Sequence, residues 1–115
     1  MTKGSRIFLE HILESIGLIE VRTESVSFEA FAQSIDLQDM VLRRLEIIGE
    51  AVRKLPREFR DAHEAIDWSK PADMRSVLIH GYFDVNLEIV WNTIHTDLPP
   101  FKKAVQDLLK DLAHD

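Results

Sequence analysis

The chain has 115 residues, of which 45% are hydrophobic and 30% are charged. This balance is typical of a folded globular protein and argues against intrinsic disorder. The absence of cysteine excludes disulfide bonds and thiolate zinc sites. Glu10, His11 and Glu14 interrupt the N-terminal apolar residues, and no apolar run is long enough to span a bilayer. We therefore expect a single domain over residues 1–115, in the cytoplasm and without membrane contact.

The net charge of −6 argues at first against a nucleic-acid ligand. The basic residues are nevertheless concentrated between residues 43 and 60, a stretch that contains six basic and three acidic residues. The six are Arg43, Arg44, Arg53, Lys54, Arg57 and Arg60. A local positive surface can attract phosphates despite the overall sign. The alternative, equally consistent with the composition, is a solvated helix face.

Hydrophobic periodicity predicts helices throughout and almost no strands. A first amphipathic helix is expected from residue 6 to about residue 24, and Ser25 and Ser27 are cap candidates for a short apolar piece after it. Asp36 is the predicted N-cap of a second long helix. The predicted inward positions of the two long helices are Phe8, Ile12, Ile16 and Ile19, and then Met40, Val41, Leu45, Ile48, Val52 and Leu55.

The second half of the chain continues the helical pattern. Pro56 ends the second helix or opens a short one around residues 58–66. Ser69 with Pro71 predicts the start of the next helix, which Gly81 would terminate. Asn86 is a predicted cap, and a last helix opens at the Pro99-Pro100 pair after a cap at Thr96 or Asp97. Four or five main helices with short connections predict an all-α, up-and-down bundle.

Residues 75–82 place three chemically capable side chains in an R-x4-H-x-Y pattern. Arg75 is a permanent cation, His80 titrates near neutral pH, and Tyr82 brings a phenol. On a continuous helix, residues five apart are rotated by about 140° and separated by about 7.5 Å. Arg75 and His80 therefore either contact different parts of a long ligand or need a second copy of the chain. In the structural alternative, Arg75 pairs with an acid such as Asp73 and His80 is hydrogen-bonded within the bundle.

No metal site is predicted. His11 and Glu14 lie at i, i+3 on one helix, but no second such unit is present to build a di-metal carboxylate site. The remaining histidines, at 63, 95 and 114, have no metal-ligand spacing to one another or to His80.

Packing roles are predicted for three further residues, Trp68, Trp91 and Gly49. Trp68 and Trp91 are expected to be core or interface anchors rather than base-stacking platforms. Gly49 lies within the second long helix, where glycine costs about 1 kcal/mol against alanine. The close approach of another helix, inside the bundle or across a dimer interface, would account for it.

Two stretches of the chain resemble a known family. Residues 42–52, with the sequence LRRLEIIGEAV, resemble the second helix of HepT-like toxins in the HEPN superfamily. Residues 74–83, then Leu87 to Trp91 and Asp97 to Pro99, resemble the C-terminal signature of that family, and Trp68 also fits. The resemblance follows nearly the whole chain in order and spacing.

The resemblance implies an all-α HEPN bundle that dimerises and brings two R-x4-H-x-Y motifs into one cleft. It implies a metal-independent endoribonuclease, the toxin of a type VII toxin–antitoxin pair, with Arg75 and His80 catalytic and Ser76 and Tyr82 positioning the substrate. The implied partner is a minimal nucleotidyltransferase antitoxin of the MntA type, which transfers AMP to Tyr82. Ser76 stands where the family commonly has asparagine or another polar residue, and its hydroxyl has a shorter reach.

The chemistry of this activity requires no cofactor. RNA carries its own nucleophile, the 2′-hydroxyl, so the enzyme supplies proton transfer and charge stabilisation, and DNA is expected to be inert. His80 would transfer protons, while the planar fork of Arg75 suits a phosphate. An alternative function is a non-catalytic module that binds and regulates, or is modified by, a partner nucleotidyltransferase. Ser76 and the acidic net charge favour that alternative.

Overall fold

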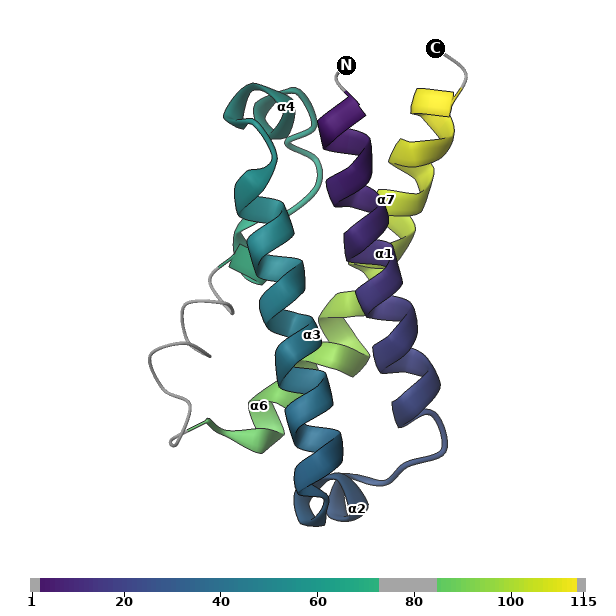
Figure 1. Ribbon diagram of the computed structural model, residues 1–115, viewed down its shortest axis with the longest axis vertical. Coiled ribbons are helices and arrows are strands. Elements are labelled where there is room, and N and C mark those ends of the chain that lie inside the picture. The colour runs from purple at the N-terminus through teal and green to yellow at the C-terminus, as the bar shows by residue number, and fades with distance from the viewer. Residues whose placement is uncertain (1–2, 73–84, 114–115) are drawn as a thin grey trace.

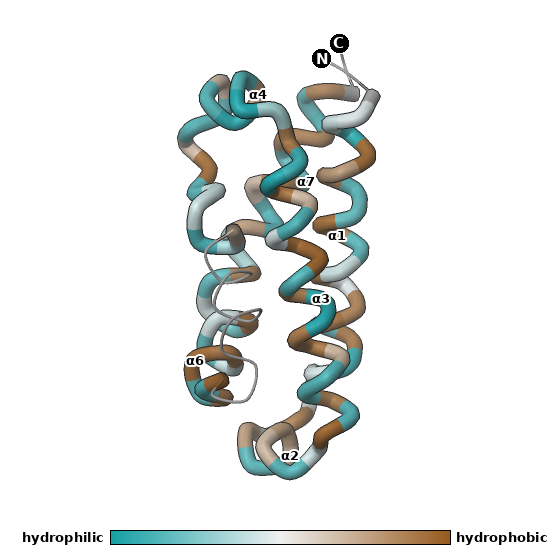
Figure 2. Tube along the Cα trace, turned by 60° about the vertical axis from the view of Figure 1, so that its left-hand side comes forward, coloured by the Kyte–Doolittle hydropathy of each residue, from teal (hydrophilic) through white to brown (hydrophobic). Residues whose placement is uncertain are grey.

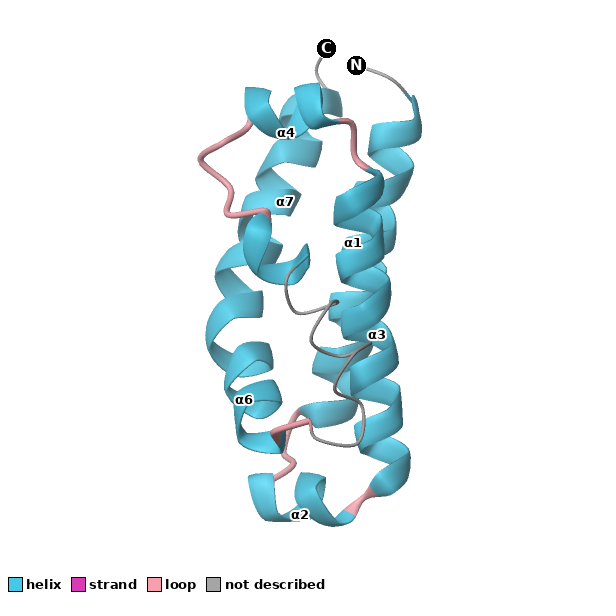
Figure 3. Cartoon of the chain, turned by 90° about the vertical axis from the view of Figure 1, so that its left-hand side faces the viewer, coloured by secondary structure: helices cyan, strands magenta, loops and turns pink. Residues whose placement is uncertain are grey.

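The computed structural model describes residues 3–72 and 85–113, and all regular structure within these ranges is helical (Figure 3). Three long helices, α1 (Lys3–Thr23), α3 (Ile35–Lys54) and α7 (Leu98–Ala113), extend along the molecule. The short helices α2 (Phe28–Gln33) and α4 (Arg57–Ala62) lie at opposite ends of it (Figure 1). The predicted all-α bundle is confirmed. None of the helices in the described ranges combines the length and apolarity required to cross a lipid bilayer.

The core is centred on the contact between α1 and α3, the most extensive contact between described helices. Both helices place apolar residues at spacings of three and four, so that each presents one hydrophobic stripe. Figure 2 shows the resulting alternation of hydrophobic and hydrophilic residues along both helices. At most 3% of the surface of these residues is exposed, and they are Leu9, Ile12, Ile16, Ile19, Val41, Leu45, Ile48 and Val52. The predicted stripes are confirmed, except that Leu9 rather than Phe8 is fully buried on α1 and that Met40 is only partly buried.

Polar contacts between described residues also join α1 to α3 and to α7. The Arg44 guanidinium on α3 donates to the Ser15 hydroxyl at 3.4 Å, and Ser15 is otherwise buried. On the other side, the Lys102 ammonium on α7 lies 2.7 Å from the Glu20 carboxylate, and both side chains are partly shielded from solvent. Directional contacts of this kind add specificity to helix packing, which hydrophobic burial alone does not supply.

The helix starts follow from local capping chemistry. The Ser27 hydroxyl accepts from the Ala30 N–H at 3.1 Å and starts α2, as predicted. The second long helix begins earlier than predicted, because the Ser34 hydroxyl accepts from the Leu37 N–H at 3.2 Å and is the N-cap. Asp36 is therefore not the cap of α3 but lies in its first turn. A carboxylate there still interacts favourably with the helix N-terminus.

The last two helices are continuous, contrary to the predicted break. α6 (Leu87–Asn92) passes through a π-helical segment, η2 (Thr93–Asp97), directly into α7. Neither Thr96 nor Asp97 is a cap, and the Leu98 N–H bonds to the Thr93 carbonyl five residues back. Prolines lack an N–H, and their rings collide with the carbonyl four residues earlier. The wider π turn accommodates Pro99 and Pro100 without breaking the helix.

Truncation of a side chain in the α1–α3 contact should destabilise the protein strongly. We expect Ile16→Ala to lower the free energy of unfolding by about 3 kcal/mol, because it leaves a cavity in a fully buried region. The matched control is Ile35→Ala, since that side chain is 71% exposed and should change stability by less than about 0.5 kcal/mol. Urea denaturation measures both. Equal losses in the two variants would contradict this description of the core.

Candidate functional site

The residues predicted to carry the chemistry lie outside the described ranges. Arg75, Ser76, His80 and Tyr82, together with Gly81, all fall between residues 73 and 84, so their roles and mutual geometry stay predictions. The structure does place the described residues on both sides of this segment. Residues 63–72 precede it and Val85 follows it, and these flanks show how the core holds the chain at both ends.

The upstream flank is anchored by Trp68. Its indole is 7% exposed and meets Phe101 of α7 edge-on, with ring centroids 5.9 Å apart. A second contact, at 6.4 Å, is with Phe59 of α4. The indole Nε1–H donates to the His63 carbonyl at 3.1 Å, so the polar atom of this buried ring is satisfied. The prediction that Trp68 is a core anchor is confirmed.

The helical turn at residues 69–72, which leads toward the motif, is capped by Asp67. The Asp67 carboxylate accepts from the Ser69 hydroxyl at 2.7 Å and from the Ser69 N–H at 3.2 Å. These donors, with the Lys70 N–H, hold the pKa of Asp67 below its usual value of 3.8. Ser69 was the predicted start signal, but it acts here as a donor to Asp67 rather than as the capping acceptor. The signal for this cap was an aspartate two residues ahead of the serine.

A weaker contact joins the same turn to the π-helical segment. The Lys70 ammonium lies 3.8 Å from the Asp97 carboxylate of η2, and both side chains are substantially exposed. Exposed pairs of this kind contribute little to stability. The Lys70–Asp97 pair still favours one position of residues 69–72 relative to η2.

The downstream flank is anchored where α6 begins. The Asn86 side-chain oxygen accepts from the N–H groups of Glu88 at 2.9 Å and Ile89 at 3.2 Å, which confirms the predicted cap. One turn later, Trp91 packs against Phe31 with ring centroids 4.9 Å apart. Because Phe31 is fully buried, this contact ties α6 to α2 and to the core. Trp91 is thus a packing residue, as predicted.

Two grooves adjoin the upstream flank. The first, of about 570 Å³, is mainly apolar and lies between α3, residues 65–71 and the continuous helix formed by α6, η2 and α7. Its described lining includes Leu45, Ile66, Ile89 and Phe101, with Lys70 and Asp97 among its few charged residues. No histidine is among the described residues that line this groove.

The second groove, of about 780 Å³, is polar. Arg53 of α3 and Arg57 and Arg60 of α4 line it together with Asp61, Glu64, Asp67 and Ser69, and it reaches Ala72. Half of the basic cluster predicted from the sequence therefore gathers here. Of the other half, Arg43 pairs with Glu46 at 3.5 Å and Arg44 binds Ser15, and both belong to α3.

The histidines of the described ranges have packing or solvent environments. His11 and Glu14 are both exposed on α1. The His63 ring packs on Phe59 at 4.7 Å. His95 of η2 packs on Trp91 at 4.3 Å, and its Nδ1 lies 2.9 Å from the Trp91 carbonyl oxygen. Within residues 3–72 and 85–113, no group of three or more potential ligands is placed to hold a metal ion.

The sequence matches the family model of HepT-like ribonucleases over residues 12–108. It is also similar to curated proteins, among them one of Thermococcus cleftensis named "Probable ribonuclease HepT", which is 40% identical over 96% of this chain and 100% of that protein. A "Putative RNase" of Caldanaerobacter subterraneus subsp. tengcongensis is 44% identical over 94% of this chain and 96% of its own length. No solved structure gives a significant match.

A third relative is a longer protein. It is the Methanocaldococcus jannaschii protein named "Gamma-glutamylcyclotransferase and putative RNase", which is 44% identical over 97% of this chain. The chain covers 50% of the length of that relative, so half of the relative has no counterpart in it.

The cap at Asp67 should make stability depend on pH. A carboxyl group whose pKa is lowered by folding stabilises the folded state above its unfolded pKa, and this contribution is lost as the pH falls through the folded value. We therefore expect Asp67→Asn to melt at a lower temperature than the wild type at neutral pH. The difference should shrink as the pH falls below 3.8.

Thermal unfolding over this pH range measures the effect. The matched control is Asp107→Asn, which removes an exposed carboxylate of α7 that pairs with Lys103 at 3.6 Å. A difference between wild type and Asp67→Asn that stays constant with pH would contradict the role of the charge.

Proposed function

Because the chain belongs to the HepT-like ribonuclease family, we propose that it is a metal-independent endoribonuclease acting as the toxin of a toxin–antitoxin pair. The observation that carries this proposal is the family match over residues 12–108, which includes the whole R-x4-H-x-Y pattern. Relatives at 40% and 44% identity that bear ribonuclease names over nearly their full length support it.

The proposed reaction uses the substrate's own nucleophile. A base removes the proton of the 2′-hydroxyl, the O2′–P bond forms, and the P–O5′ bond breaks while the leaving oxygen takes up a proton. The products are a 2′,3′-cyclic phosphate and a 5′-hydroxyl end. His80 transfers protons because imidazole titrates near neutral pH. Arg75 stabilises the charge that develops on the pentacoordinate phosphorus.

The site is proposed to be shared by two copies of the chain. The sequence separation of Arg75 and His80 would set their side chains well apart around a continuous helix. Two copies packed against each other would bring the arginine of one beside the histidine of the other. The two histidines would then supply the base and the acid that the reaction needs. Ser76 and Tyr82 would orient the phosphate or the ribose.

Tyr82 is proposed to be the point of control. A partner nucleotidyltransferase would join the Tyr82 hydroxyl oxygen to the α-phosphorus of ATP, with pyrophosphate as the leaving group. The added AMP would place a bulky anion where the substrate phosphate binds. The negative charge of the AMP would repel RNA, and its bulk would fill the space that the RNA phosphate needs.

Cleavage of a mixed RNA pool in EDTA by the wild type, Arg75→Ala and His80→Ala tests the nuclease. We expect wild-type cleavage to cyclic-phosphate ends, and a loss of about 100-fold or more in each variant, because each removes a group that acts on the reacting atoms. His11→Ala is the matched control, since His11 is exposed on α1. A requirement for added divalent metal would contradict the metal-free mechanism.

Tyr82→Phe tests the proposed control. With ATP and a cognate nucleotidyltransferase, the wild type should incorporate AMP and the variant should not, because phenylalanine has no hydroxyl. Intact-mass measurement detects the modification directly. Equal incorporation in both proteins would place the modified residue elsewhere. AMP incorporation by a wild type that cleaves no RNA would favour the non-catalytic regulatory module, to which the net charge of −6 also points.

A further inference from the structure

The outer face of α1 carries a row of exposed residues. Ile7, His11, Glu14, Leu18 and Val21 follow one another at spacings of four and three, and all five are exposed. This alternation keeps them in one line along a helix, as at the contact line of a coiled coil. We propose that this line, called here the α1 row, is an interface on which α1 of a second copy of the chain packs in the antiparallel direction.

The apolar members of the α1 row give it the character of a contact surface. Ile7, Leu18 and Val21 are 48%, 41% and 65% exposed. The buried residues of α1, such as Ile12 and Ile16, lie on the opposite side of the helix, which packs against α3 and α7. Isolated exposed apolar residues are common on proteins, but apolar residues aligned along one face form a surface that another molecule can cover.

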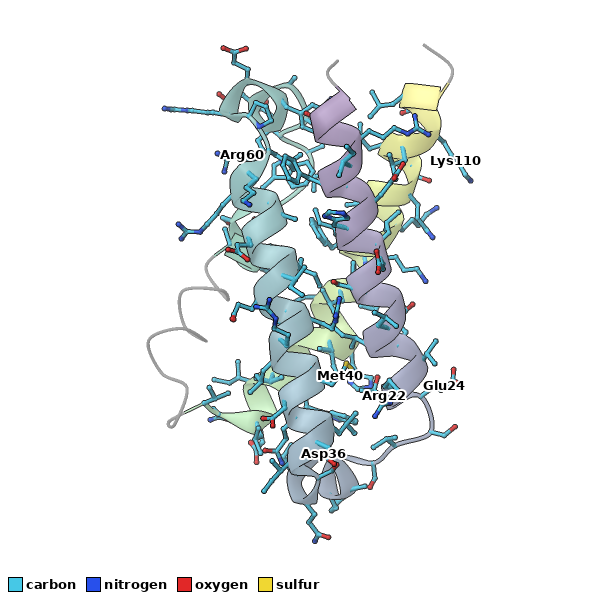
Figure 4. All side chains as sticks on the ribbon, in the orientation of Figure 1. Arg22, Glu24, Asp36, Met40, Arg60 and Lys110 are labelled. Atoms are coloured by element: carbon cyan, nitrogen blue, oxygen red, sulfur yellow. The ribbon has the colours of Figure 1, made fainter. Side chains whose placement is uncertain are left out.

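The α1 row is a different surface from the one beside the upstream flank of the R-x4-H-x-Y segment. α1 contributes no residue to the described lining of either groove at that flank. Figure 4, in the orientation of Figure 1, shows α1 at the front of the molecule with α3 beside it. Arg22 and Glu24 are labelled there at the C-terminal end of α1. The inference therefore does not depend on the proposed function.

His11 and Glu14, in the middle of the row, indicate that the partner is a second copy. Among the described residues, neither side chain has a hydrogen bond or an ion pair. A purely apolar partner would bury both of them without compensation, which is costly. In an antiparallel pair of α1 helices centred between residues 12 and 13, His11 of each copy lies opposite Glu14 of the other. One two-fold axis thus creates two pairs of complementary groups.

The same register matches the apolar residues. Ile7 of one copy lies opposite Leu18 of the other, because these two positions have the same midpoint as His11 and Glu14. Val21 lies opposite Gly4, so a large side chain meets a position that has none. A register centred on residue 14 would instead place the two Glu14 carboxylates against each other, which is unfavourable. Charge and side-chain size therefore select one register.

Gly17, beside the row, fits the close approach of a second helix. It lies within α1, where glycine lowers helix stability relative to alanine. A methyl group added at Gly17 would meet no atom within 4 Å in the described chain beyond its own helical turn, so packing within the chain does not require its small size. A helix lying along the α1 row would pass this position and could approach closely there.

The proposed contact is small. From Ile7 to Val21 the row extends over about 21 Å of helix. One pair of helices of this length buries less surface than a stable dimer usually does. We therefore expect a weak and reversible association that increases with protein concentration.

Disulfide cross-linking tests the register, because the chain has no cysteine of its own. Ile7→Cys and Leu18→Cys are purified separately, one of them with a short tag, and mixed under mild oxidation. A disulfide requires Cα atoms no more than about 7 Å apart. In the proposed pair, position 7 meets position 18, whereas the two copies of position 7 are about 16 Å apart. Ile35→Cys is the matched control, since Ile35 is 71% exposed and belongs to α3.

We expect the disulfide between positions 7 and 18 to exceed either homo-disulfide about 10-fold, because it forms within a pair rather than by random collision. Ile7→Cys mixed with Ile35→Cys should show no such preference. The three substituted side chains are exposed, so the variants should keep the fold, which melting temperatures check. A mixture without preference for positions 7 and 18 would overturn the inference, as would a preference for 7 with 7, which indicates parallel helices.

A charge exchange tests the pairs of His11 with Glu14. His11→Glu places a carboxylate opposite Glu14, and Glu14→Lys removes the carboxylate opposite His11. Each variant alone should therefore associate about 10-fold more weakly in sedimentation measurements. An equal mixture of the two should regain the wild-type association, because each substituted position then faces an opposite charge. Asp111→Lys, a like change of charge at an exposed position of α7, is the matched control and should associate as the wild type does.

A mixture of the two charge variants that associates no better than either variant alone would contradict the two-fold pairing. The α1 row would then belong to a partner of another kind. Failure of the proposed nuclease is separable from both tests. A chain that forms the disulfide between positions 7 and 18 but cleaves no RNA would keep the interface and remove the catalytic function.

Discussion

The hydrophobic contact between α1 and α3 is the constraint on which the other elements depend. Each helix contributes one continuous apolar stripe, and burial of the two stripes fixes a long antiparallel pair. α7 also packs against α1, and Lys102 of α7 pairs with Glu20 of α1 in this contact. Trp68 and Asn86 hold the described residues on either side of the segment with the candidate catalytic residues, so both flanks of that segment are fixed to the core.

The sequence was sufficient for the helices and for most of their buried faces, because periodicity and capping are local properties. Ser27 and Asn86 were identified correctly for that reason. Asp36 was the wrong cap for α3, because the extended backbone and the capping side chain belong to Ser34, two residues earlier. Local signals failed again at Thr96 and Asp97, where two prolines suggested a new helix and the chain instead widened its turn. Both errors concern boundaries rather than the architecture.

The candidate site was predictable only in part. Residue types and spacing drew attention to Arg75, His80 and Tyr82, and the family resemblance supplied their catalytic roles. These residues lie outside the described ranges, so the roles stay predictions. The groove at Arg57 and Arg60 was not predictable, although the basic cluster was visible. Its lining combines residues of α3, α4 and the loop around Asp67. A local sequence pattern cannot predict which of the six basic residues will line the same groove, because that depends on how these segments pack.

The π-helical segment η2 has a consequence for the phase of the last helix. A π turn holds one residue more than an α turn, and one residue corresponds to a rotation of about 100° about the helix axis. Phe101, Val105 and Leu108 of α7, which follows this segment directly, are buried. Loss of a single residue from this segment would leave the composition of the helix almost unchanged. It would nevertheless turn the apolar face of α7 away from α1, so the length of this short stretch is under stricter constraint than the identity of its residues.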